Sequence, residues 1–506
     1  MATASATSQT PVVDVNDGYG SKGYRGFVLG SLLLVYIFNF IDRSILGILT
    51  EPIKTSLQLE DWHMGVVGGF AFAMLYTTLG IPIARVSERT NRTMIIVVAL
   101  LLWSLMTVLC GFATGFLTLF LIRVGVGIGE AGCTPPAQSL IADYFKPSSR
   151  ATAVSIYALG VPLGGMIAGL AGGPINDYVT GENVYNILNS WGWTWIANMI
   201  DWQSLEGWRI AFFAVGFPGV VFAFILAFLI KEPPRGYTDP PEAVKQEQAS
   251  FGEVLKILSK KPTYIHVVIG AGIASFVGYG VAQFTTSFLR RTHGLSLSEA
   301  ALLFSLIIGV MAAIGVFSSG WLADKMSKRH PRALSWLPAF GMAVSVPLYA
   351  MGFLAPTVIL AMPPLMAAAL LHYFYLGPMY AVSGGVVDSR MRATSVAITL
   401  FVVNIIGLGL GPTMIGFLST FLKTIFLSGA DLGLTLNDCK PLLALDEAGV
   451  SALSGAEATN LAACLSADAR GLQWSIILFC CLYGWAALHY LLAGKTLQRD
   501  MIGRQG

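Results

Sequence analysis

The stretch GWLADKMSKR, residues 320–329, follows a long apolar segment, and ARVSERTNR, residues 84–92, follows another. A second related pair comes later in each half, DYFKPSSRATAVS at 143–155 and DSRMRATSVA at 388–397. The corresponding stretches are separated by similar offsets, which indicates an internal duplication. The chain is therefore predicted to contain two related halves, each with six membrane-spanning segments.

The composition is that of a membrane protein. Charged residues make up 12% of the 506 residues and hydrophobic residues make up 55%, whereas about a quarter of a soluble globular protein is charged. A soluble protein this apolar would have too little polar surface to cover itself. We predict an all-α integral membrane protein, because membrane helices tolerate the Gly and Pro interruptions seen here and no strand-length alternation repeats.

A helix needs about 20 mostly apolar residues to cross the hydrocarbon core. The expected domains are a disordered cytoplasmic tail (1–24), a six-helix bundle (25–232), a cytoplasmic linker with an amphipathic helix (233–262), and a second six-helix bundle (263–506). The second bundle carries an outer-face insertion at about 423–471 and a short cytoplasmic tail. Twelve segments qualify as spans, near 25–50, 62–86, 94–113, 116–143, 151–174, 208–230, 264–291, 297–322, 333–353, 356–387, 394–422 and 472–493.

The distribution of Lys and Arg predicts the orientation. These residues gather in the loops after the even-numbered spans, and the opposite loops hold few, so both termini are expected in the cytoplasm. The six cysteines show no metal-type spacing. Cys439 and Cys464 lie in the outer insertion, where either a disulfide or two free thiols would be consistent with the sequence.

Four ionisable residues of the first half fall at membrane depth, where charges are costly and usually functional. The run YIFNFIDRSILGIL, residues 36–49, carries Asp42 and Arg43 side by side, and the fourth span carries Arg123 and Glu130. Arg123 and Glu130 are nearly two helical turns apart and share a face, about 10 Å apart along the axis. Neighbours on a helix diverge by about 100° and cannot pair well with each other. We therefore expect Asp42 to meet Arg123 and Arg43 to meet Glu130.

Two interpretations of this group remain. It is either a static cluster that fixes helix packing or a switch in which Asp42 and Glu130 take up and release protons as their partners change. In the switch, Arg43 anchors an anionic substrate, because its planar fork suits phosphate or carboxylate, and Arg123 lines the same site. We favour the switch.

The loop stretches carry a family resemblance. GWLADKMSKR resembles the loop signature of the major facilitator superfamily, and ARVSERTNR is similar to a degenerate copy of it. FIDRSILGIL, RVGVGIGEAGCTPPAQSLIADYF and SSRATAVSIYALGVPLGG resemble the Spinster branch. The resemblance implies a major facilitator fold of twelve helices in two bundles, and transport of lysolipids or sphingoid phosphates.

The charged loops also suggest a latch at the cytoplasmic side. A carboxylate at a helix end can accept hydrogen bonds from a neighbouring helix or pair with Arg. Such contacts would hold the outward-open state and break as the cytoplasmic side opens; alternatively, the cations only set the topology. The residues of the predicted latch are Glu88, Arg89, Asp324, Lys325 and Arg329.

Further polar residues could line a central cavity. His372 titrates near neutral pH in water, although a lone intramembrane His is more often a hydrogen-bonded packing residue. The second half otherwise has few charges at membrane depth, which would suit the tail of an amphipathic anion. The candidates for substrate binding, besides Arg43 and Arg123, are Tyr157, Gln283, Thr286, His372 and Asn404.

The sequence therefore predicts a secondary active transporter of an amphipathic anion, coupled to protons and working by alternating access. The alternative is a proton-coupled carrier of small organic anions or drugs. No motif of a hydrolase or nucleotide-binding enzyme occurs in a useful context, and ion pairs within a bundle suit alternating access better than an open channel. We expect a monomer in the bilayer of a bacterial inner membrane, with protons and the anion as its partners and without cofactor, metal or nucleic acid.

Overall fold

The computed structural model describes residues 18–238, 250–330, 332–388, 391–445 and 447–502, and these residues form helices and no strand. Twelve helical runs among them are long and apolar enough to cross a membrane. This confirms the predicted fold class. Part of the expected tail (1–24) and part of the linker (233–262) lie outside the described residues.

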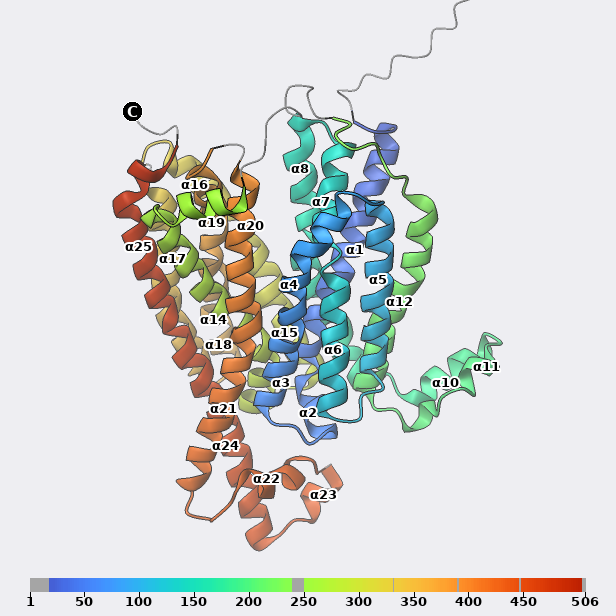
Figure 1. Ribbon diagram of the computed structural model, residues 1–506. Helices are drawn as coiled ribbons and strands as arrows, with labels where there is room; N and C mark the ends of the chain where they lie inside the picture. The colour runs from blue at the N-terminus through green and yellow to red at the C-terminus, as the bar shows by residue number, and fades with distance from the viewer. Residues whose placement is uncertain (1–17, 239–249, 331, 389–390, 446, 503–506) are drawn as a thin grey trace, which may run out of the picture.

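The spans form two bundles that stand side by side (Figure 1). The first half contains α1 (Lys22–Ile48), α3 and α4 (Asp61–Gly68, Phe70–Ser87), α5 (Arg92–Cys110), α6 and α7 (Phe116–Glu130, Thr134–Tyr144), α8 and α9 (Pro147–Ala158, Gly160–Tyr178) and α12 (Gly207–Leu229). Within this bundle α1 packs on α9, and α5 packs on α6 and α12.

The second bundle repeats this pattern: α14 packs on η7 and α21, and α17 packs on α18 and α25. Its second and fifth spans each contain a seven-residue π-helical stretch, η4 and η7. Such stretches often mark functional sites. The spans are α14 (Pro262–His293), α15, η4 and α16 (Leu297–Phe304, Ser305–Met311, Ala312–Ser327), α17 (Ala333–Phe353), α18, η5 and α19 (Val358–His372, Tyr373–Tyr375, Leu376–Gly385), α20, η7 and α21 (Arg392–Val403, Asn404–Leu410, Gly411–Ser428), and α24 with α25 (Gly455–Cys480, Leu482–Asp500).

Short helices connect the spans. They are α2 (Thr50–Ser56), α10 (Gly181–Ser190), α11 (Thr194–Ala197), η2 (Trp202–Ser204), α13 (Phe251–Leu258), α22 (Leu436–Leu443) and α23 (Glu447–Ala452). α13 lies in the expected linker and packs beside α20, with Val254 and Leu258 buried. The expected outer insertion is itself helical.

Local sequence sets the helix ends. α1 begins at Lys22, earlier than the expected end of the tail at residue 24, because the Ser21 hydroxyl accepts a hydrogen bond from the Tyr24 backbone N–H at 3.2 Å and caps the helix. Gly294 ends α14 with φ of +68°, a conformation that glycine adopts without strain.

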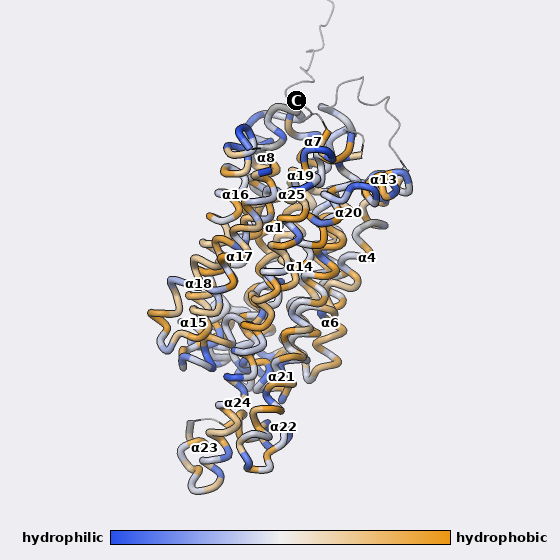
Figure 2. The backbone as a smooth tube through the Cα atoms, turned by 90° about the vertical axis from the view of Figure 1, so that its left-hand side faces the viewer, coloured by the Kyte–Doolittle hydropathy of each residue, from blue (hydrophilic) through white to orange (hydrophobic). Residues whose placement is uncertain are grey.

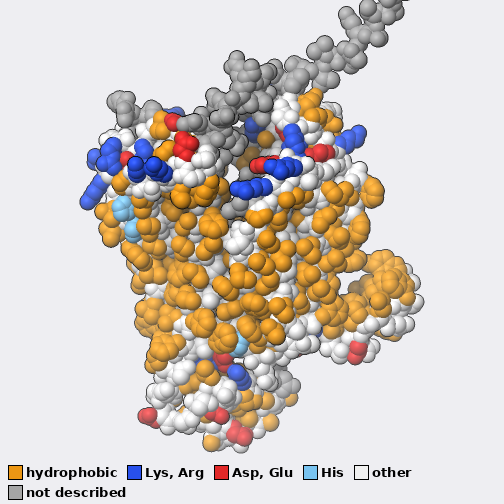
Figure 3. All heavy atoms as spheres, in the orientation of Figure 1, with side chains coloured by type: hydrophobic (Ala, Val, Ile, Leu, Met, Phe, Trp, Pro, Cys, Tyr) orange, Lys and Arg blue, Asp and Glu red, His pale blue; other side chains and the backbone are white. Residues whose placement is uncertain are grey.

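The two ends of the molecule differ in charge. Exposed Lys and Arg side chains gather at one end, where α1 begins and α25 ends, and apolar side chains cover the middle (Figures 1 and 3). The hydropathy of the backbone trace shows the same apolar middle between more hydrophilic ends (Figure 2). We call this the basic end; it includes Arg85, Arg89, Lys325, Lys328 and Arg329.

Arg92, the last residue of ARVSERTNR, is buried at the basic end of the first bundle. Its guanidinium forms ion pairs with Asp143 of α7 and, at 2.6 Å, with Glu232. It also donates to the Pro233 carbonyl at 2.9 Å. These contacts tie α5, α7 and the start of the linker together.

We expect Arg92→Met to destabilise the first bundle by about 3–5 kcal/mol, because it leaves the buried Asp143 and the partly buried Glu232 without their cation. The measurement is denaturant unfolding of the purified protein in detergent. Arg89→Met is the matched control, since Arg89 is exposed in the same loop. Equal stability of the two variants would contradict a structural role for the Arg92 ion pairs.

Candidate functional site

Arg43 of α1 and Glu130 of α6 form an ion pair inside the membrane-spanning region. Arg43 Nε donates to Glu130 Oε2 at 2.6 Å, and the side chains are 10% and 0% exposed respectively. The expected contact between these residues is therefore present. Removal of either partner would leave an uncompensated charge, which is far more costly than the intact pair.

Three aromatic rings surround the Arg43 guanidinium. Its Cζ lies 4.9 Å from the ring centroids of Phe40 and Phe72 and 4.4 Å from that of Tyr76. A cation over an aromatic face is attracted by the ring quadrupole, most strongly where water is scarce. Tyr279 of the second half packs against the same part of the first bundle. The charge is thus held by one carboxylate and several π faces near the boundary between the halves.

The second expected contact differs from the prediction. Arg123 Nη1 donates to the backbone carbonyl of Asp42 at 3.1 Å, and no ion pair joins the two side chains in the described part of the chain. Both side chains are buried. Because backbone carbonyls also satisfy a guanidinium, the spacing of Arg123 on its helix does not determine which oxygen it meets.

Unused hydrogen-bonding capacity is concentrated around this group. Buried polar atoms without a partner among the described residues include Arg123 Nε, Glu130 Oε1, Thr107 Oγ1 and both side-chain polar atoms of Asn39. Most buried polar groups in proteins are hydrogen-bonded, so exceptions of this kind need an explanation. These atoms cluster between α1, α5 and α6, beside the Arg43–Glu130 pair.

Tyr157 lies next to this region on α8. Its ring stacks on Tyr36 of α1 with centroids 4.3 Å apart, and its hydroxyl lies 3.8 Å from the Cys133 Sγ. Both rings belong to the same apolar core of the first bundle as Phe72.

The other expected substrate residues are dispersed over the second half. Gln283 Nε2 donates to Thr50 Oγ1 at 3.2 Å, so Gln283 bridges the halves. Thr286 is buried on the same helix, and Asn404 begins η7. His372 lies inside the second bundle, where its Nδ1 is 2.9 Å from the Tyr349 hydroxyl. The structure does not bring His372 to Arg43.

The predicted latch residues are all exposed at the basic end. Within the described ranges, no ion pair joins Glu88 or Arg89 to Asp324, Lys325 or Arg329. The Lys325 ammonium instead lies 4.8 Å from the ring centroid of Trp321, on its own helix.

The two halves meet at the end opposite the basic end. Hydrogen bonds and ion pairs between described residues of the two halves join residues 50–65 and 166–177 to residues 283–305, 413–423 and 468. We call this contact region the seam. This contact region was not predicted from the sequence.

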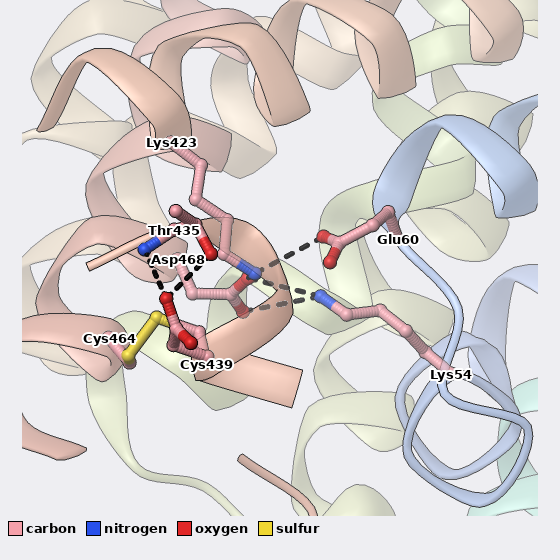
Figure 4. The surroundings of a disulfide bond; sticks show 8 residues. Lys54, Glu60, Lys423, Thr435, Cys439, Cys464 and Asp468 are labelled. Carbon is pink, nitrogen blue, oxygen red and sulfur yellow. Dashed lines mark hydrogen bonds and ion pairs between the residues drawn. A yellow bond between two sulfur atoms is a disulfide. The ribbon is translucent and has the colours of Figure 1, made fainter. Parts of the chain in front are cut away.

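A buried network of charges crosses the seam. Lys54 Nζ lies 3.2 Å from Asp468 Oδ1, which is 2.9 Å from Lys423 Nζ (Figure 4). Arg291 pairs with Glu51 and Asp61, both at 2.6 Å. The network also includes Glu60, which is 3.2 Å from Lys423 Nζ. Acidic and basic residues of each half therefore form ion pairs with residues of the other half.

Small residues let the backbones approach closely in the seam. A side chain on Gly65 would clash with the Pro412 carbonyl of α21, and one on Gly416 would clash with the Asp61 carbonyl of α3. Gly169 of α9 lies against Ser305 in the same way. Membrane helices often pack through such positions.

Two network groups lie between spans, and their pKa shifts fix their charges near neutral pH. Burial raises the pKa of Glu51, but Arg291 and Lys54 bring it below its ordinary value. Burial and Arg291 lower the pKa of Lys54, but Asp468 and Asp61 bring it above its ordinary value.

The signs of these shifts set the pH window of the closed seam. The Glu51 contribution is present above the ordinary pKa of about 4.3 and is lost as pH falls through the lowered value. The Lys54 contribution is present below about 10.4 and is lost as pH rises through the raised value. Neither group responds to pH in the neutral range.

A disulfide supports the second-half side of the network. Cys439 of α22 and Cys464 of α24 are bonded, with Cα atoms 5.5 Å apart. Leu427 and Ala467 pack with them in a small core. Cys464 precedes Asp468 by about one helical turn, so the disulfide fixes the turn that carries the Asp468 carboxylate (Figure 4).

Two six-helix bundles that meet at one end, with paired charges at membrane depth, define a transporter of the major facilitator type. The chain belongs to the Major Facilitator Superfamily, whose family description matches residues 32–412.

Known proteins narrow this class. The chain is 32% identical to an MFS-type efflux pump of Mycolicibacterium smegmatis over 77% of this chain and 83% of that protein. It is 26% identical to protein spinster homolog 1 of Xenopus tropicalis over 78% and 73%. A crystal structure of a bacterial homologue of the human lysosomal transporter Spinster, in an inward-facing and unoccupied conformation, is 40% identical with a TM-score of 0.86, covering 95% of this chain and 99% of that one. The chain is thus a Spinster-like member of the superfamily.

We expect Asp468→Asn to open the seam. The neutral amide would not compensate the charges of Lys54, Arg291 and Lys423, which pair with the Asp468 carboxylate. The loss of one partner of a buried ion group costs the closed arrangement about 3 kcal/mol. Pulsed electron resonance distances between spin labels at Thr55→Cys and Thr424→Cys would then show a longer population.

Glu457→Gln, an exposed change on the same helix, is the control and keeps the short distance. An unchanged distance distribution in Asp468→Asn would show that the ion network does not hold the seam.

Proposed function

We propose that this protein is a secondary active transporter that moves an amphipathic anion by alternating access and couples this to protons through Asp42 and Glu130. One observation carries the proposal: Arg43 is held at membrane depth by a single carboxylate and three aromatic faces. A guanidinium in this setting is a binding group for a phosphate or carboxylate.

Competition for Arg43 supplies the coupling. While Glu130 is ionised it occupies the Arg43 Nε at 2.6 Å. A proton on Glu130 weakens this pair and frees the guanidinium for the substrate head group. Asp42 is the neighbouring carboxylate, and its side chain has no ion pair with Arg123 in the described residues. It is the second candidate to carry a proton.

The substrate tail would lie against the second half. That half has few charges at membrane depth, and Tyr279 and Leu408 pack towards the Arg43 region. Tyr157, Gln283, Thr286 and Asn404 are the remaining candidates for contact with the substrate. A lysolipid or sphingoid phosphate is the class of substrate that the sequence resemblance to the Spinster branch implies.

The seam and the latch would alternate. The seam is closed at the end opposite the basic end, while Asp324 and Glu88 are exposed and unpaired across the halves in the described residues. We infer a state open towards the basic end. In the opposite state the seam separates and the latch residues meet.

The orientation follows from the positive-inside rule. Cytoplasmic loops carry the excess of Lys and Arg, so the basic end and both termini would face the cytoplasm. The state described here would then be inward-facing. We expect a monomer in a bacterial inner membrane.

A carrier of small organic anions or drugs is the second candidate. The similarity to an efflux pump favours it, because that protein is 32% identical to this chain. Counterflow in proteoliposomes separates the two functions. A labelled lysolipid that exchanges while labelled polar acids do not supports the lipid substrate, and the reverse result supports the second candidate.

We expect Glu130→Gln to abolish the pH dependence of transport while part of the counterflow exchange remains, because the amide cannot take up the proton but leaves Arg43 available. Transport is measured in proteoliposomes over a pH series. Glu457→Gln, a change of an exposed carboxylate outside the site and the latch, is the control and keeps the wild-type profile. Glu130 is not the proton acceptor if its variant keeps that profile too.

We expect Arg43→Gln to weaken substrate binding by at least roughly tenfold, because a hydrogen bond to a charged group contributes about 1.5–3 kcal/mol. Arg43→Lys would restore only part of the affinity, since an ammonium lacks the planar fork. Binding to purified protein, measured by calorimetry, checks both. Wild-type affinity in Arg43→Gln would remove Arg43 from the binding site.

A further inference from the structure

The segment between α9 and α12 projects sideways from the first bundle at the end opposite the basic end (Figure 1). It contains α10, α11 and η2. The seam and the ion pairs described above do not involve α10 or α11. Its surface therefore needs a separate explanation.

α10 has one apolar face and one polar face. Val184, Ile187, Leu188 and Trp191 recur at the spacing of a single helix face. The opposite face carries polar residues, among them Asn186. A helix with this pattern normally buries its apolar face against another surface.

The apolar side chains of this segment are nevertheless exposed. Trp191 is 66% exposed, Trp195 67% and Met199 73%, and Trp193 and Ile187 are exposed as well. Hydrophobic side chains gather on this projection, level with the lower part of the apolar belt (Figure 3). Contiguous exposed apolar surface marks an interaction site, and Trp is enriched at membrane–water interfaces.

The segment is fixed at a defined height on the bundle. Trp202 is buried, donates from Nε1 to the Ile196 carbonyl at 3.3 Å, and meets Phe213 of α12 edge-on with ring centroids 5.8 Å apart. Gly181 lies directly against the Trp202 carbonyl. The two ends of the segment are thereby clamped together at the end of a membrane span.

The apolar surface of the segment continues into the lipid-facing side of α12. Phe217, Val221, Phe224 and Phe228 are exposed along that helix and form a stripe that begins near Phe213. Because α12 is a membrane span, this exposed stripe would face acyl chains. The apolar surface of α10 and α11, at the end of this span, would then lie near the interface between acyl chains and water.

We propose that residues 181–199 lie in the interface of the leaflet at the end opposite the basic end, with Ile187, Trp191 and Trp195 directed towards the acyl chains and Asn186 towards water. Under the orientation proposed above this is the outer leaflet. The occupant of the apolar face is the bilayer itself, in the manner of an interfacial amphipathic helix. The proposal depends on the membrane-spanning fold and not on the transported substrate.

Such an anchor would act on one half only. It is attached to the first bundle through Trp202 and Phe213, whereas the second bundle carries its disulfide-bonded extension at that end. The first bundle would keep its depth in the bilayer while the second moves against it.

Spin-label accessibility tests this placement. In a Cys481→Ser background, which removes the exposed free thiol, single labels are introduced at Ile187→Cys, Trp195→Cys and Asn186→Cys. The protein is placed in nanodiscs of phosphatidylcholine and phosphatidylglycerol. Labels at Phe224→Cys and Glu457→Cys give the values for lipid and for water. The readout is the ratio of relaxation by oxygen to relaxation by a nickel chelate.

We expect ratios at Ile187→Cys and Trp195→Cys several-fold above that at Asn186→Cys and close to that at Phe224→Cys. Water-like ratios at all three positions would overturn the proposal. Low access of both reagents at Ile187→Cys and Trp195→Cys would also overturn it, because a protein partner or a second copy would then cover the face.

A measurement without labels guards against misfolded variants. Lipids brominated close to the headgroup should quench the Trp fluorescence of the wild-type protein, and the combined changes Trp191→Phe, Trp193→Phe and Trp195→Phe should reduce this quenching. Equal quenching in the two proteins would contradict the proposal. The elution volume in gel filtration confirms that the variant is folded.

Discussion

A charge that leaves water must find a partner, and this constraint organises the structure. Arg92 meets Asp143 and Glu232 at the basic end, Arg43 meets Glu130 at membrane depth, and a network around Asp468 crosses the seam. The three groups differ in what they connect. The first joins elements of one bundle, the second joins two helices and leaves its cation near the boundary of the halves, and the third joins the bundles. Only the last two can change when the bundles move.

The Arg43–Glu130 pair and the network around Asp468 would have different roles in transport. The seam holds one end closed through charges that are constant around neutral pH, as the shifts of Glu51 and Lys54 require. Under the proposed function, a proton-dependent step would therefore start elsewhere, at the buried carboxylates next to Arg43. Because a ligand shifts an equilibrium only through its different affinity for the two states, the substrate must contact both halves. The packing of Tyr279 against the first bundle shows how close the second half comes to Arg43.

The sequence predicted the twelve spans, the two halves and the Arg43–Glu130 contact, because hydropathy, repetition and charges within apolar segments can be recognised from the order of residues alone. It did not predict that Arg123 meets the Asp42 carbonyl, since any turn of a helix offers oxygens besides carboxylates. It also missed the seam. Lys54 and Asp468 lie more than 400 residues apart, and at the ends of spans such residues are indistinguishable from those that only set topology. The acidic pair Glu60–Asp61 and the basic pair Arg290–Arg291 were the available signal.

The glycines of the seam are needed for the closed arrangement of the two halves more than for the folding of either bundle. Gly65 and Gly416 face each other's helices so closely that even a methyl group would not fit. Both lie between the halves, which would separate under the proposed alternating access, and not inside one bundle. A chain with alanine there could still assemble both bundles. It would lose one of its two end states and stay open at that end. Selection at such positions would act on the conformational change and not on folding. Natural variants at these glycines should then lose transport while the protein is still produced and folded.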